Sequence, residues 1–231
     1  MDDLNSSIQS ILKSAAGNLI SSDYNSALEE LKKAEVKDKD NPEILYNLGI
    51  TYTRLGLFKT ALDYFNRVVS LEIRFIDIQH VKKNLAFCLI HMERYDEAIQ
   101  YLDSVLQDFP SDIQALNMKG YSLEKSGKIN DSLRTYSEVF KYDKTNINTL
   151  NSTAYLMAKQ GINLDKALEI AAYIYRRDRN NPAYRDTLGY IYLKSGNYDL
   201  AEKHLNAALN ELPFNTEIAE HMKELRSKKD I

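Results

Sequence analysis

The chain has 231 residues, a length that suits one globular domain or a short stack of repeats. Apolar residues make up 44%, too many for a disordered chain, and 8 glycines with 4 prolines leave little room for long loops. The formal net charge of −3 argues against non-specific nucleic-acid binding, which needs a concentrated basic surface.

The cysteine content and the N-terminus indicate a compartment. One cysteine, Cys88, allows no internal disulfide and fits a reducing environment. The opening residues MDDLNSSIQSILK lack the basic and apolar regions of a signal peptide. No apolar run approaches the roughly 20 residues that span a bilayer. We therefore expect a cytoplasmic protein without membrane insertion. Whether an export signal has been removed from this sequence is left open.

One stretch, from Asn181 to Pro213, carries the most regular spacing in the chain. Its landmarks are Leu188-Gly189, Tyr192, Gly196, Tyr198, Ala201, Leu205, Ala208 and Pro213. This spacing resembles the tetratricopeptide repeat (TPR), a 34-residue helix–turn–helix with the pattern W-x2-L-G-x2-Y, A-x3-F and P. Arg185 stands at the Trp position and Leu205 at the Phe position, while the small residues stay small.

The same frame, carried through the chain, predicts a single array over residues 1–231. The predicted repeats are 8–41, 42–78, 79–112, 113–146, 147–181 and 182–215. Gly49 and Gly189 share repeat position 8 but lie 140 residues apart, four more than four repeats require. We place three inserted residues near Leu71–Ile78, where we expect a longer second helix or a shifted junction, and one near Gly161–Leu164.

Taken in order, the repeats differ in how well they keep the pattern. The first is the most degenerate, as terminal repeats often are, and the fourth has Ser132 in place of a small Ala. Glycines fall at the turn inside four repeats, where a left-handed helix cap favours them: Gly56, Gly127, Gly161 and Gly196. Residues 215–229 follow as an amphipathic helix with Ile218, Met222 and Leu225 on one face, which we expect to cap the stack.

The resemblance implies an all-α fold, an α-solenoid of about six helix–turn–helix repeats with a right-handed groove. A helix turns about 100° per residue, so repeat positions 4, 7, 8 and 11 of each first helix face its partner helix. Positions 2, 5, 9, 12 and 13 lie opposite, on the side that lines the groove in the TPR family. Position 9 reads Ala16, Ile50, Phe87, Tyr121, Tyr155 and Tyr190.

The four aromatics at position 9 have two interpretations. They are either contacts for a ligand, since Tyr offers apolar area and a hydroxyl at small entropic cost, or packing between neighbouring repeats. Asparagines lie beside them, namely Asn47, Asn84, Asn117 and Asn151. An amide can pair with the backbone of an extended peptide, as in some TPR arrays, or can simply be solvated.

Position 13 is basic in five repeats, with Arg54, His91, Lys125, Lys159 and Lys194. These cations form a stripe for an acidic partner or only complement the helix dipole. Lys83 suits a carboxylate clamp known in some TPR proteins, but Phe87, Asn148 and Ser152 replace its required companions. We therefore do not expect that clamp.

No motif indicates an enzyme, a cofactor or a metal site. The histidines lack metal-ligand spacing, and neither a phosphate-binding loop nor a nucleophile motif is present. Cys88 lies among apolar residues and is expected to be buried and inert.

The function predicted from the resemblance is that of a scaffold or adaptor that binds a protein or peptide segment in its groove, whether strand or helix. The alternative is a structural subunit of a larger assembly, such as a secretion or motility apparatus, that self-associates or docks by its edge. The residues expected to contact a partner are Tyr46, Asn47, Ile50, Lys83, Asn84, Phe87, Asn117, Tyr121, Asn151, Tyr155 and Tyr190.

Overall fold

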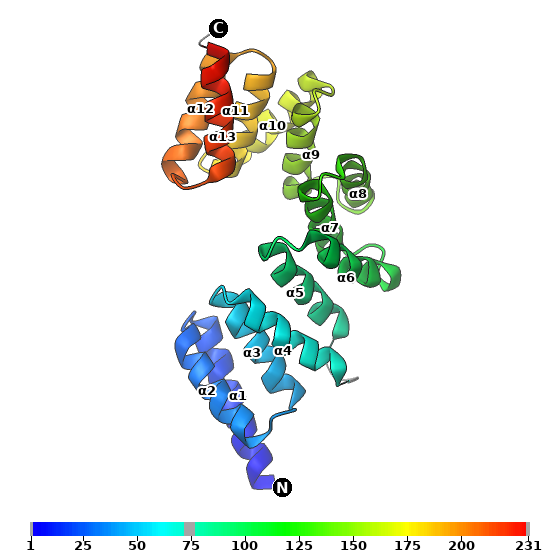
Figure 1. Ribbon diagram of the computed structural model, residues 1–231, viewed down its shortest axis with the longest axis vertical. Helices are drawn as coiled ribbons and strands as arrows, with labels where there is room; N and C mark the ends of the chain where they lie inside the picture. Colours follow the sequence, from blue (N-terminus) through cyan, green and yellow to red (C-terminus); the bar gives the residue numbers. More distant parts are fainter. Residues whose placement is uncertain (1, 72–76, 230–231) are drawn as a thin grey trace. The chain divides into compact units, whose positions relative to one another are not determined.

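The computed structural model describes residues 2–71 and 77–229, and the regular structure in these ranges is entirely α-helical (Figure 1). The helices are α1 (Asp2–Ile20), α2 (Tyr24–Lys37), α3 (Pro42–Arg54), α4 (Phe58–Ser70), α5 (Ile78–His91), α6 (Tyr95–Asp108), α7 (Ile113–Lys125), α8 (Ile129–Tyr142), α9 (Ile147–Lys159), α10 (Leu164–Arg177), α11 (Pro182–Lys194), α12 (Tyr198–Glu211) and α13 (Thr216–Lys229). The fold class is the predicted α-solenoid of paired helices with a final single helix.

Helix starts agree with the predicted frame to within one residue from the second repeat on. The clearest cases are α3 and α11, each of which begins at a proline. Proline suits the first helical position, because its fixed φ is helical and its missing N–H would have no partner there. Asn41 and Asn181 precede these prolines, and their side chains accept hydrogen bonds from backbone N–H groups of the first turn.

The turns inside the repeats use a left-handed residue after the first helix. The four predicted glycines have φ between 66° and 77°, which confirms their role. Ser22 and Glu93 take the same place in the first and third repeats with φ of 63° and 58°. The turn geometry is therefore kept even where the residue is not glycine, at a cost in backbone strain.

The predicted insertions can be compared with the turns. Four residues separate α9 from α10, whereas three separate the helices of the other repeats, so the insertion near Gly161–Leu164 is confirmed. Asn163 absorbs the extra residue with a left-handed φ of 46° and caps α10. In the second repeat α4 ends at Ser70, so the longer second helix is not found. The shifted junction proposed there falls on residues 72–76, outside the described residues.

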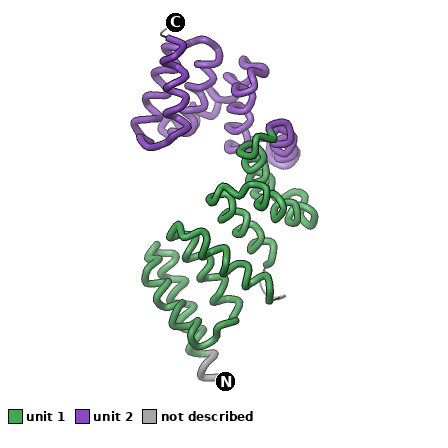
Figure 2. The backbone as a smooth tube through the Cα atoms, in the orientation of Figure 1, with its two compact units in different colours: residues 1–128 green, residues 129–231 purple. Residues whose placement is uncertain are grey.

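The chain divides into two compact units, residues 1–128 with α1 to α7 and residues 129–231 with α8 to α13 (Figure 2). We call them unit 1 and unit 2. In unit 1, α3, α5 and α7 are first helices of successive repeats and contact one another. In unit 2, α9, α11 and α13 do the same. The side chains at the groove positions of each unit are thereby brought onto neighbouring helices.

Paired helices approach most closely at repeat position 8. A Cβ atom on Gly49 would lie 2.6 Å from the Phe65 ring, and one on Gly189 would lie 2.8 Å from Cγ of Leu205. Phe65 and Leu205 are fully buried. At Gly49 and Gly189, glycine is thus required by the distance between the two helices, as the pattern predicted.

The last helix, α13, buries Ile218, Met222 and Leu225, the three residues expected on its apolar face. Its outer face is polar, with exposed Glu220 and Lys223. An amphipathic helix in this place gives the last repeat a cover and presents charged groups to solvent.

Candidate functional site

Unit 1 carries eight of the predicted contact residues, on α3, α5 and α7. Tyr46 lies between two of these helices, since its hydroxyl accepts a hydrogen bond from Nδ2 of Asn84 at 3.4 Å. Its ring packs edge-on against Phe65 at 6.0 Å between centroids. Tyr46 and Asn84 are partly buried and serve the packing of α3 on α5 as well as any outside contact.

Lys83, also on α5, is buried and its ammonium group is 2.8 Å from the carboxylate of Asp112, which caps α7. Burial alone would raise the pKa of Asp112, but hydrogen bonds from Lys83 and from the backbone N–H of Ala115 lower it overall. The charge of Lys83 is therefore paired inside unit 1.

Phe87 belongs to a compact group of three rings with Phe58 and His91. The ring centroids of Phe87 and His91 are 4.2 Å apart, and those of Phe58 and His91 are 4.5 Å apart. Nδ1 of His91 lies 3.0 Å from the carbonyl oxygen of Phe87, to which it can only donate, and this bond fixes the imidazole over the ring. Phe87 is 38% exposed. Phe58, the first residue of α4, was not among the contact residues predicted from the sequence.

Tyr121 repeats this arrangement on α7. It is 39% exposed, it meets Tyr95 edge-on at 6.4 Å, and Nζ of Lys125 lies 5.5 Å from its centroid. Ile50, at the same repeat position on α3, is partly buried. At repeat position 9, the described part of unit 1 thus presents two exposed rings, Phe87 and Tyr121, each with a cation or imidazole four residues further along the same helix.

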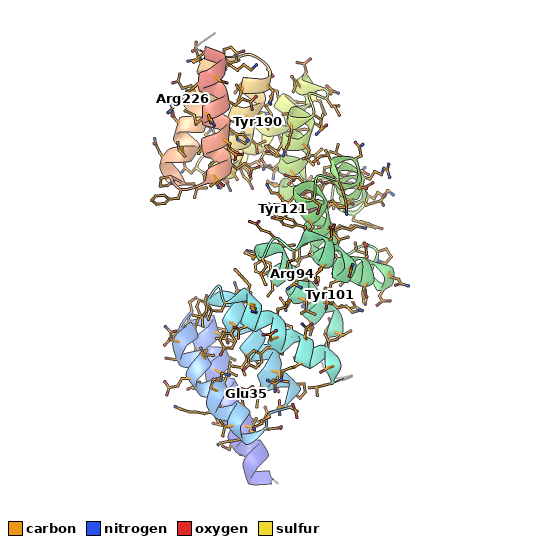
Figure 3. The ribbon with its side chains drawn as sticks, viewed as in Figure 1. Glu35, Arg94, Tyr101, Tyr121, Tyr190 and Arg226 are labelled. Atoms are coloured by element: carbon orange, nitrogen blue, oxygen red, sulfur yellow. The ribbon has the colours of Figure 1, made fainter. Side chains whose placement is uncertain are left out.

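In unit 2 the equivalent rings are covered. Tyr155 is 9% exposed and Tyr190 5% exposed, and their centroids are 5.2 Å apart. His221 of α13 stacks on Tyr190 at 4.1 Å, and the Tyr155 hydroxyl donates to Glu217 of α13 at 2.8 Å. Figure 3 labels one ring of each kind: the covered Tyr190 on α11, beside α13, and the exposed Tyr121 on α7. Burial beneath α13 favours the packing interpretation for Tyr155 and Tyr190.

A buried polar group holds α13 in place. Nδ1 of His221 is 2.8 Å from Asp186 of α11, and both side chains are almost fully buried. Lys194 forms an ion pair with Glu224 on the same helix pair. Burial raises the pKa of Tyr190, which keeps its hydroxyl neutral. The contacts of α13 with the rest of unit 2 therefore include ion pairs as well as apolar packing.

The basic residues at repeat position 13 have a structural explanation that the sequence analysis missed. Lys125, Lys159 and Lys194 each lie over the position-9 ring of their own helix, at 5.5, 5.4 and 5.0 Å from the centroid. These are cation–π contacts between residues four apart. Position 9 and position 13 therefore act as one pair, and the aromatic run and the basic stripe are one feature.

The remaining asparagines have different surroundings. Asn47 on α3 and Asn117 on α7 are partly buried. The Oδ1 atom of Asn151 is buried and has no hydrogen-bond partner among the described residues. A buried amide oxygen without a hydrogen bond costs stability. Of the four asparagines, Asn151 is therefore the one whose presence is least explained by packing within the protein.

Other candidate chemistry is limited. Cys88 is buried, and burial raises the pKa of its thiol, which disfavours the reactive thiolate. Within residues 2–71 and 77–229, no three His, Cys, Asp or Glu side chains are grouped so that they could hold a metal ion. None of the described helices combines the length and the apolar character that crossing a bilayer demands.

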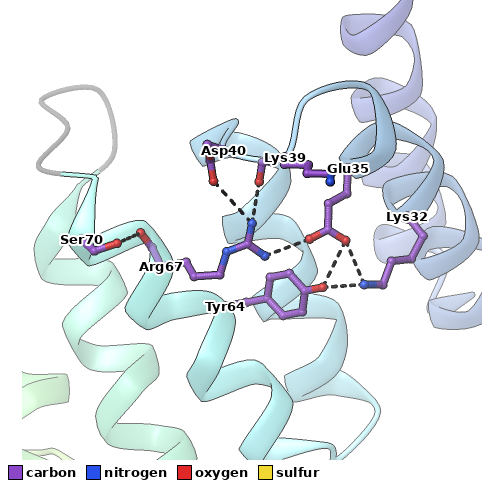
Figure 4. Close-up of polar contacts among 7 residues, drawn as sticks. All are labelled: Lys32, Glu35, Lys39, Asp40, Tyr64, Arg67 and Ser70. Atoms are coloured by element: carbon purple, nitrogen blue, oxygen red, sulfur yellow. Dashed lines mark hydrogen bonds and ion pairs between the residues drawn. The ribbon is translucent and has the colours of Figure 1, made fainter.

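A polar network joins the first two repeats on the second-helix side of unit 1 (Figure 4). Glu35 of α2 accepts hydrogen bonds from Lys32 and from Arg67 of α4, both at 2.9 Å. The hydroxyl of Tyr64 bonds to Glu35 at 3.2 Å, and its ring stacks on Tyr52. Burial would raise the pKa of Glu35, but the hydrogen bonds from Lys32 and Arg67 lower it overall.

Comparisons with known proteins agree with the repeat pattern. A family model described as "TPR repeat" matches residues 20–56, and two described as "Tetratricopeptide repeat" match residues 84–112 and residues 42–72 with 184–211. These matches lie in four of the six predicted repeats, namely the first, second, third and sixth.

Two curated relatives and one solved structure illustrate the similarity. The chain is 24% identical over 153 residues to a TPR repeat-containing protein of Methanocaldococcus jannaschii, and 23% identical over 147 residues to the Drosophila melanogaster protein O-mannosyl-transferase Tmtc3. Each match covers 63% of the chain. The chain spans only 27% and 15% of the lengths of these relatives. The structure of PilW, described as a widely conserved type IV pilus biogenesis factor, is 17% identical with a TM-score of 0.75, covering 93% of this chain and 98% of PilW.

Proposed function

Because the chain belongs to the tetratricopeptide-repeat proteins, we propose that it is a binding module that holds a segment of another protein, and that the exposed groove-side rings of unit 1 make the contact. The observation that carries the proposal is the contrast between Phe87 and Tyr121, which are 38% and 39% exposed, and Tyr155 and Tyr190, which α13 covers. Rings that the free protein leaves in solvent are available to a partner.

The chemistry of these rings indicates the kind of partner. Phe87 with His91, and Tyr121 with Lys125, each place a flat apolar surface beside a group that is or can become positively charged. Arg54, at the equivalent position on α3, is exposed and has no ion-pair partner among the described residues. An apolar side chain with a neighbouring carboxylate complements such pairs. The partner segment is expected to alternate apolar and acidic residues.

The mechanism is preorganisation. The rings are fixed before binding, Phe87 by Phe58 and His91 and Tyr121 by Tyr95. A surface that is already ordered loses little side-chain freedom on association, so more of the contact energy appears as affinity. No catalytic step is part of the proposal.

The test is capture of partners from a cell lysate with the whole chain, followed by the same capture with Phe87→Ala and Tyr121→Ala. A partner retained by the wild-type chain and lost by both variants supports the proposal. Arg94→Ala is a matched control, because Arg94 is an exposed residue of the same unit whose side chain forms an ion pair with Glu97. Retention of every captured protein by both ring variants would contradict the proposal.

A second candidate function is a building block that docks by its edge into a larger assembly. One observation favours it: Phe214, in the turn before α13, is 96% exposed and follows exposed Leu212. A large apolar side chain in solvent is stabilised by covering it. Light scattering over a concentration series separates the two candidate functions. The building block is expected to form an oligomer that dissociates in the Phe214→Ser variant, whereas the binding module is expected to be a monomer.

A further inference from the structure

The junction between the first two repeats is joined on the second-helix side by contacts of Arg67. Arg67 of α4 reaches the loop before α3, where it donates to the carbonyl oxygen of Lys39 at 2.6 Å and lies 3.6 Å from Asp40. Its other nitrogen bonds to Glu35 of α2 (Figure 4). The cation and the carboxylate both belong to the chain, so the space is filled and its charge is balanced.

The equivalent place in unit 2 is formed by the loop before α9 and by α10. The repeat frame relates Lys39, Asp40, Leu45, Tyr64, Arg67 and Ser70 to Lys144, Thr145, Leu150, Ile170, Tyr173 and Arg176. These second six residues, with Glu169, line a concavity of about 280 Å³. Glu35, the carboxylate of the first junction, corresponds to Phe140. Glu35 and its partner Arg67 are thus both replaced, by Phe140 and Tyr173, while Lys144 keeps the lysine and Arg176 adds a cation in place of Ser70.

The charges around the concavity leave two cations unmatched. Lys144 and Arg176 have no ion-pair partner among the described residues. Glu169, the carboxylate in the lining, is held by Lys166 at 2.8 Å. Asp143, next in the chain to Lys144, accepts hydrogen bonds from Thr145 and Asn146. Neither Glu169 nor Asp143 forms an ion pair with Lys144 or Arg176 in the described part of unit 2.

The wall of the concavity is partly apolar. Leu150 of α9 and Ile170 and Tyr173 of α10 are half-buried there, and the guanidinium group of Arg177 lies 4.9 Å from the Tyr173 centroid. A volume of this size suits one side chain or a molecule of a few heavy atoms. Apolar walls beside two cations favour a group that has a short hydrocarbon part and a negative end.

We propose that this concavity is a binding site for a carboxylate carried on a short apolar group, with the carboxylate between Lys144 and Arg176 and the hydrocarbon part against Leu150 and Ile170. The bound carboxylate supplies to these two cations the kind of partner that Glu35 supplies to Arg67 in unit 1. Arginine suits this role because its planar fork donates two parallel hydrogen bonds to a carboxylate. The group can come from an acidic side chain of a protein segment or from a free short-chain acid. The site is separate from the exposed rings of unit 1.

The experiment uses the whole ¹⁵N-labelled chain and records backbone amide shifts during titration. The probes are 4-methylpentanoate and the blocked dipeptide N-acetyl-Leu-Glu-amide, and their neutral controls are 4-methylpentanamide and N-acetyl-Leu-Gln-amide. We expect saturable shifts at residues 144–150 and 169–176 with the acids and not with the amides. Binding by the dipeptide alone identifies a protein segment as the source, and binding by both acids shows that the free acid suffices.

The double variant Lys144→Gln and Arg176→Gln should weaken binding of the acids at least tenfold. Both side chains are exposed, so the fold should be kept, which the unchanged remainder of the spectrum checks. Lys141→Gln is the control, since Lys141 is a nearby exposed lysine that pairs with Glu138. The proposal is overturned if the acids shift no residue in this region, if the amides bind equally well, or if the double variant binds the acids as tightly as the wild-type chain.

Discussion

Replacing Gly189 by leucine should destabilise unit 2, because no space exists for a side chain there. A Cβ atom at this position would lie 2.8 Å from Cγ and 3.1 Å from the backbone nitrogen of Leu205. Leu205 is fully buried, so relief requires α12 to move away from α11. Overpacking typically costs about 1–3 kcal/mol, and the contact with backbone places Gly189 in the upper part of that range, about 2–3 kcal/mol. Leucine regains up to about 1 kcal/mol of helix propensity over glycine. The expected net loss is about 1–2 kcal/mol.

Thermal melting followed by circular dichroism measures this loss. In a chain of this size, 1 kcal/mol corresponds to roughly 2–4 °C, so the melting temperature should fall by roughly 2–8 °C. Gly17→Leu is the matched control, since a Cβ on Gly17 would meet nothing within 4 Å. There the substitution changes only the helix propensity, which favours leucine over glycine. Its melting temperature should be unchanged or higher. Identical melting of the two variants would refute the close approach at position 8.

Three further predictions concern single residues. Glu93→Gly should raise stability in urea by about 0.5–1 kcal/mol, because φ is 58° at Glu93; a loss of stability would show that this turn is not strained. Glu35→Gln should lower stability by about 1 kcal/mol, while Glu29→Gln, in an exposed pair with Lys33, should leave urea unfolding unchanged; equal effects would contradict the network's role. Burial, then Lys203 and Arg185, lower the pKa of His204 below 6.5, so the unfolded chain binds this proton more readily. The contribution of His204 to the free energy of unfolding is present above about pH 6.5. It is lost as the pH falls through the pKa that His204 has in the folded protein. His204→Gln should therefore flatten the fall in melting temperature between about pH 7 and 5, and an unchanged slope would count against it.

The helices could be predicted from the sequence because their signals are local. Pro42 and Pro182 mark helix starts, Gly56 and Gly196 mark turns, and each acts on its own few residues. The left-handed turn at Glu93 was not predicted, because glutamate gives no local signal for it. The repeat frame, which relates distant positions, is what places Glu93 beside the glycines.

The solvent exposure of the residues at repeat position 9 could not be predicted from the sequence. Tyr121 and Tyr155 occupy the same repeat position, yet one is 39% and the other 9% exposed. The difference comes from Glu217 and His221, which lie more than 60 residues after Tyr155 and on a helix beyond the last repeat. Repeat position predicts the direction of a side chain, whereas exposure depends on which other helix covers it.

The most direct test of the account compares exposed with covered rings in one set of variants, with Tm and the Kd for the captured partner measured on each. For Phe87→Ala and Tyr121→Ala, the account predicts at least about thirtyfold weaker binding, equivalent to about 2 kcal/mol, with little change in Tm. For Tyr155→Ala and Tyr190→Ala, it predicts a clear fall in Tm, since truncating a buried aromatic typically costs about 3–5 kcal/mol, with the Kd of the folded protein unchanged. The opposite pattern, with binding lost at the covered rings and kept at the exposed ones, would contradict the account.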